Sequence, residues 1–263
     1  MGHDKLRKFA ENETFACLLQ PDSRELLSDG YFNLKDHPVK GKWSEFLHHD
    51  APVILELGCG KGEYTVDLAG RDIDHNYIGV DIKGARLWKG AKLASQRQMP
   101  NVGFLRTRIE FINAFFAPNE VEQIWLTFSD PQMKSENSRL TSPLFLERYR
   151  KFLKPGGVVH LKTDSRFLHE YTKAVCKVNG LEILACTDNL YAEEHPADGL
   201  DAVVREVKTF YEKMSLSQGF DITYLAFRLD SDKPLRHPED PSEFDSKLWR
   251  SLEAPRHFFG QGV

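Results

Sequence analysis

The chain has 263 residues, of which 41% are hydrophobic and 28% are charged, and its formal net charge is −4. This composition is typical of a globular protein and excludes a strongly basic chain, so a nucleic-acid site must be a local patch. The four cysteines form no CxxC pair, which indicates reduced thiols rather than a disulfide framework. We see no secretory signal and no apolar run near the ~20 residues of a membrane span, so we expect a cytoplasmic location without membrane contact.

The first 50 residues are polar, with scattered aromatic side chains and no sustained hydrophobic period. We interpret residues 1–50 as an N-terminal arm. Within it, KLRK at residues 5–8 is a small basic cluster, which is either a solvated surface or part of a binding patch.

From residue 52 onward, short apolar runs alternate with segments of helical spacing. This alternation predicts an α/β fold built on a doubly wound, mostly parallel sheet with right-handed crossovers. The expected helices cover 63–71, 84–98, a segment 142–157 that starts at Ser142 and Pro143 and ends in a Gly-rich stop, and a stretch ending near 179. The seven expected strands cover 52–58, 76–82, 101–107, 121–129, 158–164, 181–188 and 222–229.

The expected elements divide the chain into three parts. The α/β domain covers 51–229 and contains an insertion at 189–220, whose stretch DAVVREVKTFYEKMSLSQG has helical character. Residues 230–263 are rich in proline and charge, and we expect them to form a tail packed on the domain.

The segment ELGCGKG at 56–62 joins the first expected strand to the first expected helix. Its glycines, Gly58, Gly60 and Gly62, permit a tight turn and leave no side chain between the backbone and a ligand. Asp81 ends the second strand, where an acid can accept hydrogen bonds from both hydroxyls of a ribose. In an open α/β sheet, ligands bind at this edge.

Glu56 distinguishes this loop from a dinucleotide site. The glycines follow G-x-G-x-G rather than G-x-G-x-x-G, and a carboxylate at Glu56 would repel a pyrophosphate, so both features argue against NAD. The acid suits a cationic ligand such as the sulfonium and amino group of S-adenosylmethionine. Alternatively, Glu56 only accepts hydrogen bonds from amides of the loop.

Asp130-Pro131 ends the buried run VEQIWLTFS abruptly. Proline disfavours a helical conformation at the residue before it, so the chain turns outward and holds the carboxylate over the expected ligand crevice. The alternative is a turn acid that accepts hydrogen bonds from nearby amides.

Five segments resemble the class I S-adenosylmethionine-dependent methyltransferases and, within them, the tRNA (guanine-N7-)-methyltransferases. The similarity covers roughly residues 50–229, with a weaker match at KLRKFAEN in the arm. The glycine loop is common to class I enzymes, whereas F-x-D-P, RLTSP, LKTD and T-x-x-E are more specific. The segments are VILELGCGKGEYTVDLA, YIGVDIKGARLWKGAKLA, WLTFSDPQMK, RLTSPLFLERYRKFLKPGGVVHLKTD and TFYEKMSLSQG.

The resemblance implies a Rossmann-like, seven-stranded sheet with an antiparallel last strand, and S-adenosyl-L-methionine as cofactor. It implies methylation of guanine N7 in tRNA, at position 46 of the variable loop. Asp130 would be catalytic. Cofactor contacts would be made by Glu56, Asp81, Asp130 and the glycines at 58, 60 and 62, and contacts to guanine or tRNA by Lys134, Asp164, Thr209 and Glu212.

The chain departs from the family pattern at two places. Arg108 stands where the family has an acid near the adenine, so we assign no adenine contact there. The usual F-P-D-P-W-P-K-K is replaced by FSDPQMKSENSRL, which lacks the tryptophan and most of the basic residues. A basic helix face made of Lys83, Arg86, Lys89 and Lys92 either compensates in tRNA binding or is simply solvated.

The chemistry needs little from the protein beyond positioning. Guanine N7 carries an in-plane lone pair and attacks a methyl sulfonium without deprotonation, so alignment and electrostatic support are the main requirements. Asp164 can accept from guanine N1–H and N2–H, and Lys134 can donate to O6 or a phosphate. The guanine must leave its stack to enter such a pocket.

Thr209 and Glu212 would lie on one face of a helix, but Glu212 is alternatively only a surface acid.

The histidines at 48, 49, 195 and 257 lack metal-ligand spacing, so we expect no metal. A rival function is a tRNA- or partner-binding module that keeps the fold with weak catalysis, and the chain is either a monomer or a homodimer. The expected enzyme requires the acids at 56, 81, 130 and 164 to serve one pocket.

Overall fold

The computed structural model describes residues 3–27, 33–192 and 202–253. Residues 193–201 of the expected insertion, which include His195, lie outside the described residues. So do residues 254–263 of the expected tail, which include His257. The described strands are β1 (Leu18–Leu19), β2 (Val53–Leu57), β3 (Asn76–Asp81), β4 (Val102–Arg106), β5 (Val121–Thr127), β6 (Leu153–Thr163), β7 (Ile183–Thr187) and β8 (Thr223–Arg228).

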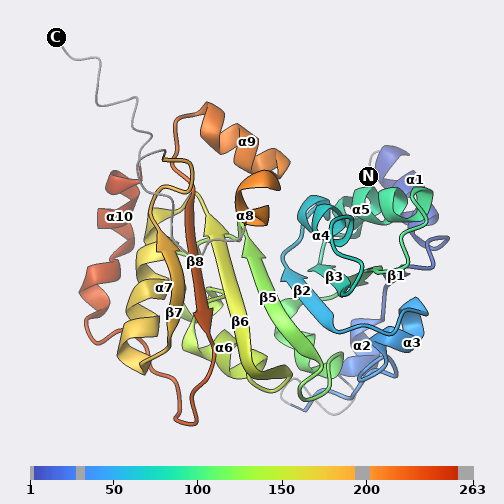
Figure 1. Cartoon of the computed structure of the whole chain (residues 1–263), viewed down its shortest axis with the longest axis horizontal. Helices are drawn as coiled ribbons and strands as arrows, with labels where there is room; N and C mark the ends of the chain where they lie inside the picture. Colours follow the sequence, from blue (N-terminus) through green and yellow to red (C-terminus); the bar gives the residue numbers. More distant parts are fainter. Residues whose placement is uncertain (1–2, 28–32, 193–201, 254–263) are drawn as a thin grey trace. The chain divides into compact units, whose positions relative to one another are not determined.

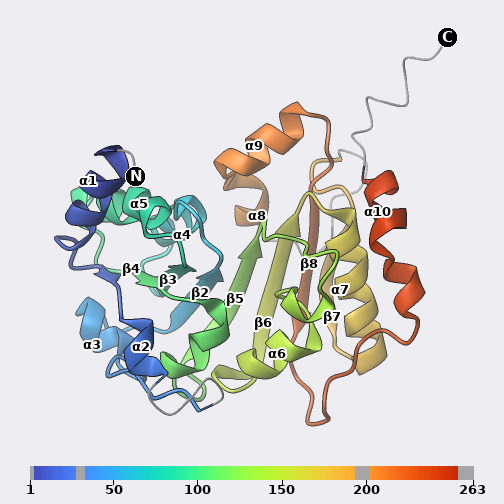
Figure 2. The same cartoon turned by 180° about the vertical axis from the view of Figure 1, so that it is seen from behind.

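From β2 to β7, at least one helix or 3-10 helix joins each strand to the next in sequence (Figures 1 and 2). Short 3-10 helices also occur, namely η1 (Ile109–Ala114), η2 (Glu136–Ser138) and η3 (Pro241–Phe244). The α-helices are α1 (His3–Asn12), α2 (Ser23–Leu26), α3 (Trp43–Leu47), α4 (Glu63–Ala69), α5 (Gly84–Gln96), α6 (Pro143–Tyr149), α7 (Arg166–Asn179), α8 (Val203–Glu206), α9 (Phe210–Ser217) and α10 (Ser246–Leu252).

The hydrogen-bonded strand order is β1-β4-β3-β2-β5-β6-β8-β7. Strand β2 pairs in parallel with β3 and with β5, and β3 pairs in parallel with β4. Strand β8 runs antiparallel to both β6 and β7. The mostly parallel α/β sheet with an antiparallel last strand is thus confirmed.

Strand β1 is an addition that we did not expect. Leu18 and Leu19 pair in parallel with Phe104 and Leu105 of β4, so the segment interpreted as an arm supplies an eighth, edge strand. Two apolar residues in a polar context are too short to produce a period-2 pattern, which explains why the sequence did not reveal this strand.

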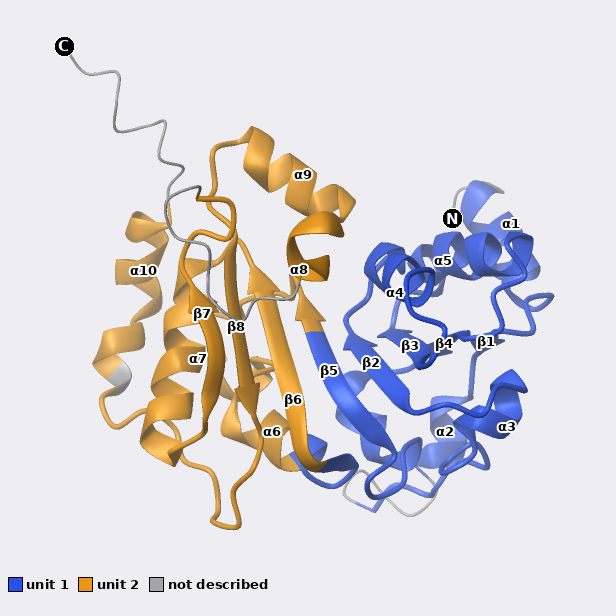
Figure 3. Cartoon of the chain, viewed as in Figure 1, with its two compact units in different colours: residues 1–125, 148–154 blue, residues 126–147, 155–263 orange. Residues whose placement is uncertain are grey.

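The chain forms two compact units, which Figure 3 shows in different colours. Unit 1 comprises residues 1–125 and 148–154, and unit 2 comprises 126–147 and 155–263. We describe each unit by itself.

In unit 1, helices cover both faces of the parallel strands. A Cβ atom on Gly103 would meet side chains of α3, whereas Phe104 points to the opposite face and approaches Gly62 and Gly90 beside α4 and within α5. Adjacent residues of a strand point to opposite faces, so these contacts place α3 on one face and α4 with α5 on the other. Unit 1 is therefore doubly wound.

Helix α1 packs on α5 through polar as well as apolar contacts. The Asn12 side chain donates to the carbonyl of Gly84 at 2.9 Å, and the indole N–H of Trp88 donates to Glu11 at 2.7 Å. Helix α1, at the start of the expected arm, is thus held on α5 by one buried and one partly buried hydrogen bond.

The connection from α6 to β6 is shorter than expected. Ser142 receives the N–H of Phe145 at 3.4 Å and so caps α6, but the helix ends at Tyr149 and β6 already begins at Leu153. Phe152 is fully buried and its carbonyl accepts from Val121 of β5, so strand pairing starts before the Gly-rich stop.

Unit 2 contains α7, which starts at the capping hydroxyl of Ser165 and ends at Gly180 in the left-handed conformation. Its Phe167 ring contacts Phe244 and Trp249 edge-on, with centroid distances of 6.0 and 5.7 Å. The described part of the expected tail therefore packs on α7. None of the described helices has the length and apolar character that crossing a membrane requires.

Candidate functional site

The glycine loop of unit 1 makes a tight turn directly after β2. The N–H groups of Gly58 and Cys59 both donate to the carbonyl of Val80 in β3, at 2.8 and 3.0 Å. Gly58, Gly60 and Gly62 all have positive φ angles, of 78°, 57° and 68°. This left-handed backbone is accessible to glycine at little cost, which accounts for the spacing of the three glycines.

The three glycines differ in what surrounds them. A Cβ atom on Gly58 or Gly60 would meet nothing within 4 Å, whereas one on Gly62 would lie 2.5 Å from the ring of Phe104. Gly58 and Gly60 thus leave open space above the backbone, as a ligand cradle requires. Gly62 is needed for packing.

The two acids of unit 1 hold this loop in shape. Asp81 accepts from the N–H groups of Gly60 at 3.0 Å and of Lys83 at 2.7 Å. Glu56, which is 4% exposed, accepts from the backbone N–H of Thr65 at 2.9 Å and from its hydroxyl. Thr65 belongs to α4, so these hydrogen bonds come from the helix after the loop and not from the loop amides that the alternative named.

Two carboxylates act on the cysteine of the glycine loop. Burial, followed by the carboxylates of Glu56 and Asp81, raises the pKa of the Cys59 thiol well above its usual value. Both acids disfavour a thiolate at Cys59, and by the same effect they favour a cation nearby.

In unit 2, the chain leaves β5 through a strained turn. Phe128 and Gln132 have positive φ angles of 52° and 46°, and Asp130 between them is exposed. The Asp130 Oδ1 atom accepts from the N–H of Gln132 at 3.0 Å, so the turn role that we considered is present. The N–H of Phe128 donates to the carbonyl of Lys162 at 2.9 Å, which places this turn beside the end of β6.

The sequence did not predict two buried hydroxyl groups near strand ends. The Oγ atoms of Ser129 in unit 2 and of Thr107 in unit 1 are buried and have no hydrogen-bond partner among the described residues. Thr107 directly follows β4 and Ser129 lies two residues after the end of β5, and this position near a strand end was the only sequence signal. Thr107 precedes Arg108, whose guanidinium pairs with Glu110 at 3.3 Å.

Asp164 follows β6 and is held by helix α9. Its Oδ2 atom accepts a hydrogen bond from the hydroxyl of Ser215 at 2.5 Å. Asp164, Arg166 and Glu253 also line a cavity of about 50 Å³ in unit 2. Lys134 lies exposed in the loop that follows Asp130.

Thr209 and Glu212 begin α9. Thr209 is the N-cap, and its side chain and that of Glu212 form a reciprocal capping box. Glu212 is fully buried and accepts from the hydroxyl of Tyr191 at 2.5 Å. The alternative that Glu212 is a surface acid is therefore wrong.

A buried ion pair fixes the insertion to the sheet. The ammonium of Lys162 in β6 lies 2.8 Å from Glu212, and both side chains are 0% exposed. The same ammonium donates to the carbonyls of Val204 at 2.7 Å and Val207 at 2.9 Å, so its three hydrogens are satisfied. Burial lowers the pKa of Lys162, and the carboxylate of Glu212 opposes this shift.

The basic face on α5 is partly neutralised. Lys89 pairs with Glu63 at 2.6 Å, and Lys92 with Glu11 at 3.4 Å. Arg7, Lys8 and Lys92 also lie over the ring of Trp88, at 5.1, 5.0 and 4.8 Å from its centroid. Lys83 is exposed and Arg86 is half-buried. Cations from α1 and α5 thus gather around one indole ring.

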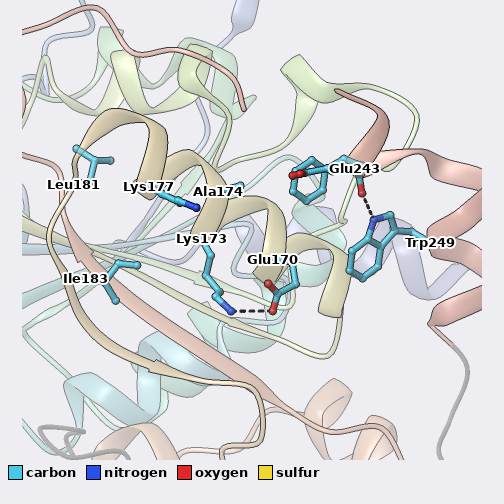
Figure 4. A pocket seen from close by; sticks show the side chains of 9 residues that line it. Glu170, Lys173, Ala174, Lys177, Leu181, Ile183, Glu243 and Trp249 are labelled. Carbon is cyan, nitrogen blue, oxygen red and sulfur yellow. Dashed lines mark hydrogen bonds and ion pairs between the residues drawn. The ribbon is translucent and has the colours of Figure 1, made fainter. Parts of the chain in front are cut away.

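A groove of about 730 Å³ lies elsewhere in unit 2, along α7 (Figure 4). Lys173 pairs with Glu170 at its rim, and the indole N–H of Trp249 donates to the carbonyl of Glu243 at 2.6 Å. None of the expected site residues lines it. Within residues 3–27, 33–192 and 202–253, no group of three His, Cys, Asp or Glu side chains is arranged to hold a metal ion.

We predict that Lys162→Met lowers the free energy of unfolding by about 3–5 kcal/mol, because it leaves the Glu212 charge buried without a cation. Lys162→Met/Glu212→Gln should recover more than half of this loss, since the carboxamide can keep the capping hydrogen bond. Urea unfolding at pH 7 measures both.

The control for this prediction is Lys173→Met. It removes a pair in which the two side chains are 40% and 33% exposed, so its effect should stay below about 1 kcal/mol. Equal losses for the Lys162 and Lys173 variants would contradict the role of the buried pair.

Comparison with known proteins supports one family. A family described as putative methyltransferase matches residues 50–224. The chain is 49% identical over 229 residues, 86% of its length and 98% of the relative's, to a tRNA (guanine-N(7)-)-methyltransferase of Christiangramia forsetii. It is 47% identical over 248 residues, 93% of each chain, to the protein of that name from Bacteroides thetaiotaomicron.

Solved structures support the fold. The crystal structure of the 16S rRNA methyltransferase KamB matches with a TM-score of 0.55 and 15% identity, over 74% of this chain and 95% of that one. The expected methyltransferase fold is thus confirmed. From the relatives and the family match together, the chain belongs to the tRNA (guanine-N(7)-)-methyltransferase family.

Proposed function

We propose that this chain transfers a methyl group from S-adenosyl-L-methionine to N7 of a guanine in tRNA, with the variable-loop guanosine at position 46 as target. Family membership supports the reaction class. The observation that carries the proposal is the acidic loop of unit 1, in which Gly58 and Gly60 leave open space beside the carboxylates of Glu56 and Asp81.

The loop suits the cofactor on three counts. Gly58 and Gly60 allow a ligand to approach the backbone, Asp81 offers carboxylate oxygens to a ribose, and Glu56 adds the negative charge that a cationic ligand favours. When bound, the cofactor supplies an electrophilic methyl group on a positively charged sulfur. Gly62 contributes indirectly, by letting α4 pack against Phe104.

The catalytic residue is Asp130, which acts as a carboxylate. Guanine N7 needs no general base, so a carboxylate serves by holding its ligand and by balancing the positive charge that moves onto the purine. The turn bond to Gln132 occupies one position on Oδ1 and holds the carboxylate in place. Ser129, with its buried and unpaired hydroxyl, offers a further contact beside it.

The remaining residues of unit 2 bind the guanine and its phosphate. Asp164 accepts from N1–H and N2–H, and Lys134 donates to O6 or a phosphate. Thr209 and Glu212 present the start of α9 to the tRNA. Since Glu212 is buried and paired with Lys162, it acts by fixing this segment.

The tRNA backbone is held by local positive charge. Lys83, Arg86, Lys89 and Lys92, together with Arg7 and Lys8 near Trp88, supply cations in a chain whose net charge is −4. Phosphate contacts of this kind weaken as salt rises. The four cysteines are free, which suits the reducing cytoplasm.

The direct test is mass spectrometry of nucleosides from unmodified tRNA incubated with the protein and S-adenosyl-L-methionine. The enzyme should produce 7-methylguanosine, and tRNA in which adenosine replaces the target guanosine should not be modified. Tight tRNA binding without product would favour the rival binding module, in line with the loss of basic residues after Asp130.

We predict that Asp130→Ala lowers turnover by about 100-fold or more, on the order of the effect of removing one preorganised electrostatic group. The fold should change little, because Asp130 is exposed and its hydrogen bond from Gln132 is local. Initial rates and thermal unfolding measure the two effects.

A matched control exists in the tail. Asp240 is also exposed, also precedes a proline, and also accepts from the N–H two residues on, at 2.8 Å from Ser242. Asp240→Ala should therefore leave turnover unchanged. Near wild-type product formation by Asp130→Ala would show that its role is misassigned.

We also predict that Gly60→Ala and Gly62→Ala fail differently. Each introduces a side chain at positive φ, which costs ~1 kcal/mol. Gly60→Ala places its methyl group in the ligand space and should weaken S-adenosylhomocysteine binding about 10-fold or more, as measured by calorimetry.

Gly62→Ala should instead lose stability, because its methyl group would overlap the Phe104 ring. Phe104→Leu in the same chain should restore part of that stability by making room. Equal cofactor affinities for Gly60→Ala and the wild type would argue against the cradle.

A further inference from the structure

We propose that Ser215 is a positioning residue that orients Asp164 for recognition of the guanine N2 amino group. The inference rests on the proposed function, because it concerns the acid that we assign to the guanine. No sequence motif pointed to Ser215. It lies in the second turn of α9, and its hydroxyl donates to Asp164 Oδ2 at 2.5 Å.

Helix α9 is attached to the end of β6 at two points. Lys162 pairs with Glu212, and Asp164 with Ser215. Lys162 in β6 and Asp164 directly after it are two residues apart, and Glu212 and Ser215 are three apart in α9, so the two helix residues lie on one face of α9. Glu212 and Ser215 are 0% and 4% exposed, which shows that this helix face is buried against β6.

The outer face of α9 carries the opposite pattern. Phe210, Tyr211 and Met214 are 52%, 37% and 39% exposed, so the helix rests on the sheet through its Glu212–Ser215 face. The ion pair, the capping box and the carbonyl contacts of Lys162 fix the start of the helix. Ser215 is thereby presented to Asp164 from a fixed support.

In this arrangement the two oxygens of the Asp164 carboxylate have different surroundings. Oδ2 is held by a hydroxyl that is itself nearly inaccessible to water, and a hydrogen bond from a hydroxyl to a charged oxygen is stronger than a neutral one. Oδ1 accepts no hydrogen bond from the described residues. Ser215 therefore fixes the plane of the carboxylate, while Oδ1 and the second lone pair of Oδ2 can accept from the ligand.

A fixed carboxylate matters most for a two-point contact. Guanine presents N1–H and N2–H side by side, and a carboxylate accepts from both only when its plane matches theirs. A carboxylate free to rotate still attracts donors but no longer requires the second one. The loss of Ser215 should therefore reduce discrimination in favour of the N2 amino group more than it reduces methylation itself.

The experiment compares tRNA carrying guanosine at the target position with tRNA carrying inosine there. Inosine keeps N7, O6 and N1–H but lacks the N2 amino group. We expect wild-type kcat/KM to favour guanosine by about 10-fold or more, the discrimination that a good two-point contact gives. In Ser215→Ala the preference should fall to about threefold or less, with unchanged affinity for S-adenosylhomocysteine.

Ser217→Ala is the matched control. It removes a hydroxyl from the same helix, but that hydroxyl is exposed and donates to the Met214 carbonyl within α9. Its guanosine preference should equal that of the wild type. A merely structural role of Ser215 would lower both rates equally and leave their ratio unchanged, and that result would overturn the inference.

A second Ser215 variant and the wild-type rates on the two tRNAs complete the test. If Ser215→Ala does not fold, Ser215→Cys keeps the size and replaces a strong donor with a weak one, so its preference must fall in the same direction. A wild-type enzyme that methylates both tRNAs equally would overturn the positioning role while leaving the proposed function intact. A wild type that methylates neither would overturn both.

Discussion

The buried ion pair between Lys162 and Glu212 is the interaction on which the arrangement of unit 2 around β6 depends. Two charges without solvent exposure are costly unless each is fully paired, and here the ammonium has three acceptors. Lys162 joins β6 to α8 through the carbonyl of Val204 and to α9 through the carboxylate of Glu212. Both helices are short, with four and eight residues. Through the ion pair, the position of Thr209 and Ser215 follows from the position of the sheet.

Unit 1 uses a different principle, in which the backbone itself makes room. The hydrogen bonds from Gly58 and Cys59 to Val80 and from Gly60 to Asp81 keep the loop closed on β3. Its rigidity comes from the same acid that we assign to the cofactor. Binding and loop shape are therefore coupled at Asp81, and a substitution there would affect both.

The sequence predicted the parallel sheet, the glycine loop and the strand-end acids, because strand runs and glycine spacing are local patterns. It could not predict what Glu212 contacts, since burial of an acid depends on a lysine 50 residues earlier. It also missed Ser215, Ser129 and Thr107. Hydroxyls of this kind are common in any sequence, and only tertiary contacts distinguish them.

The two-residue strand β1 has a consequence for the assembly of the chain. Without Leu18 and Leu19, the backbone of β4 would present unpaired N–H and C=O groups along its outer edge, and such edges recruit strands from other molecules. By pairing with β4, strand β1 blocks part of this edge from pairing with a strand of another molecule. Because β1 has only two residues, its own outer edge exposes few backbone groups.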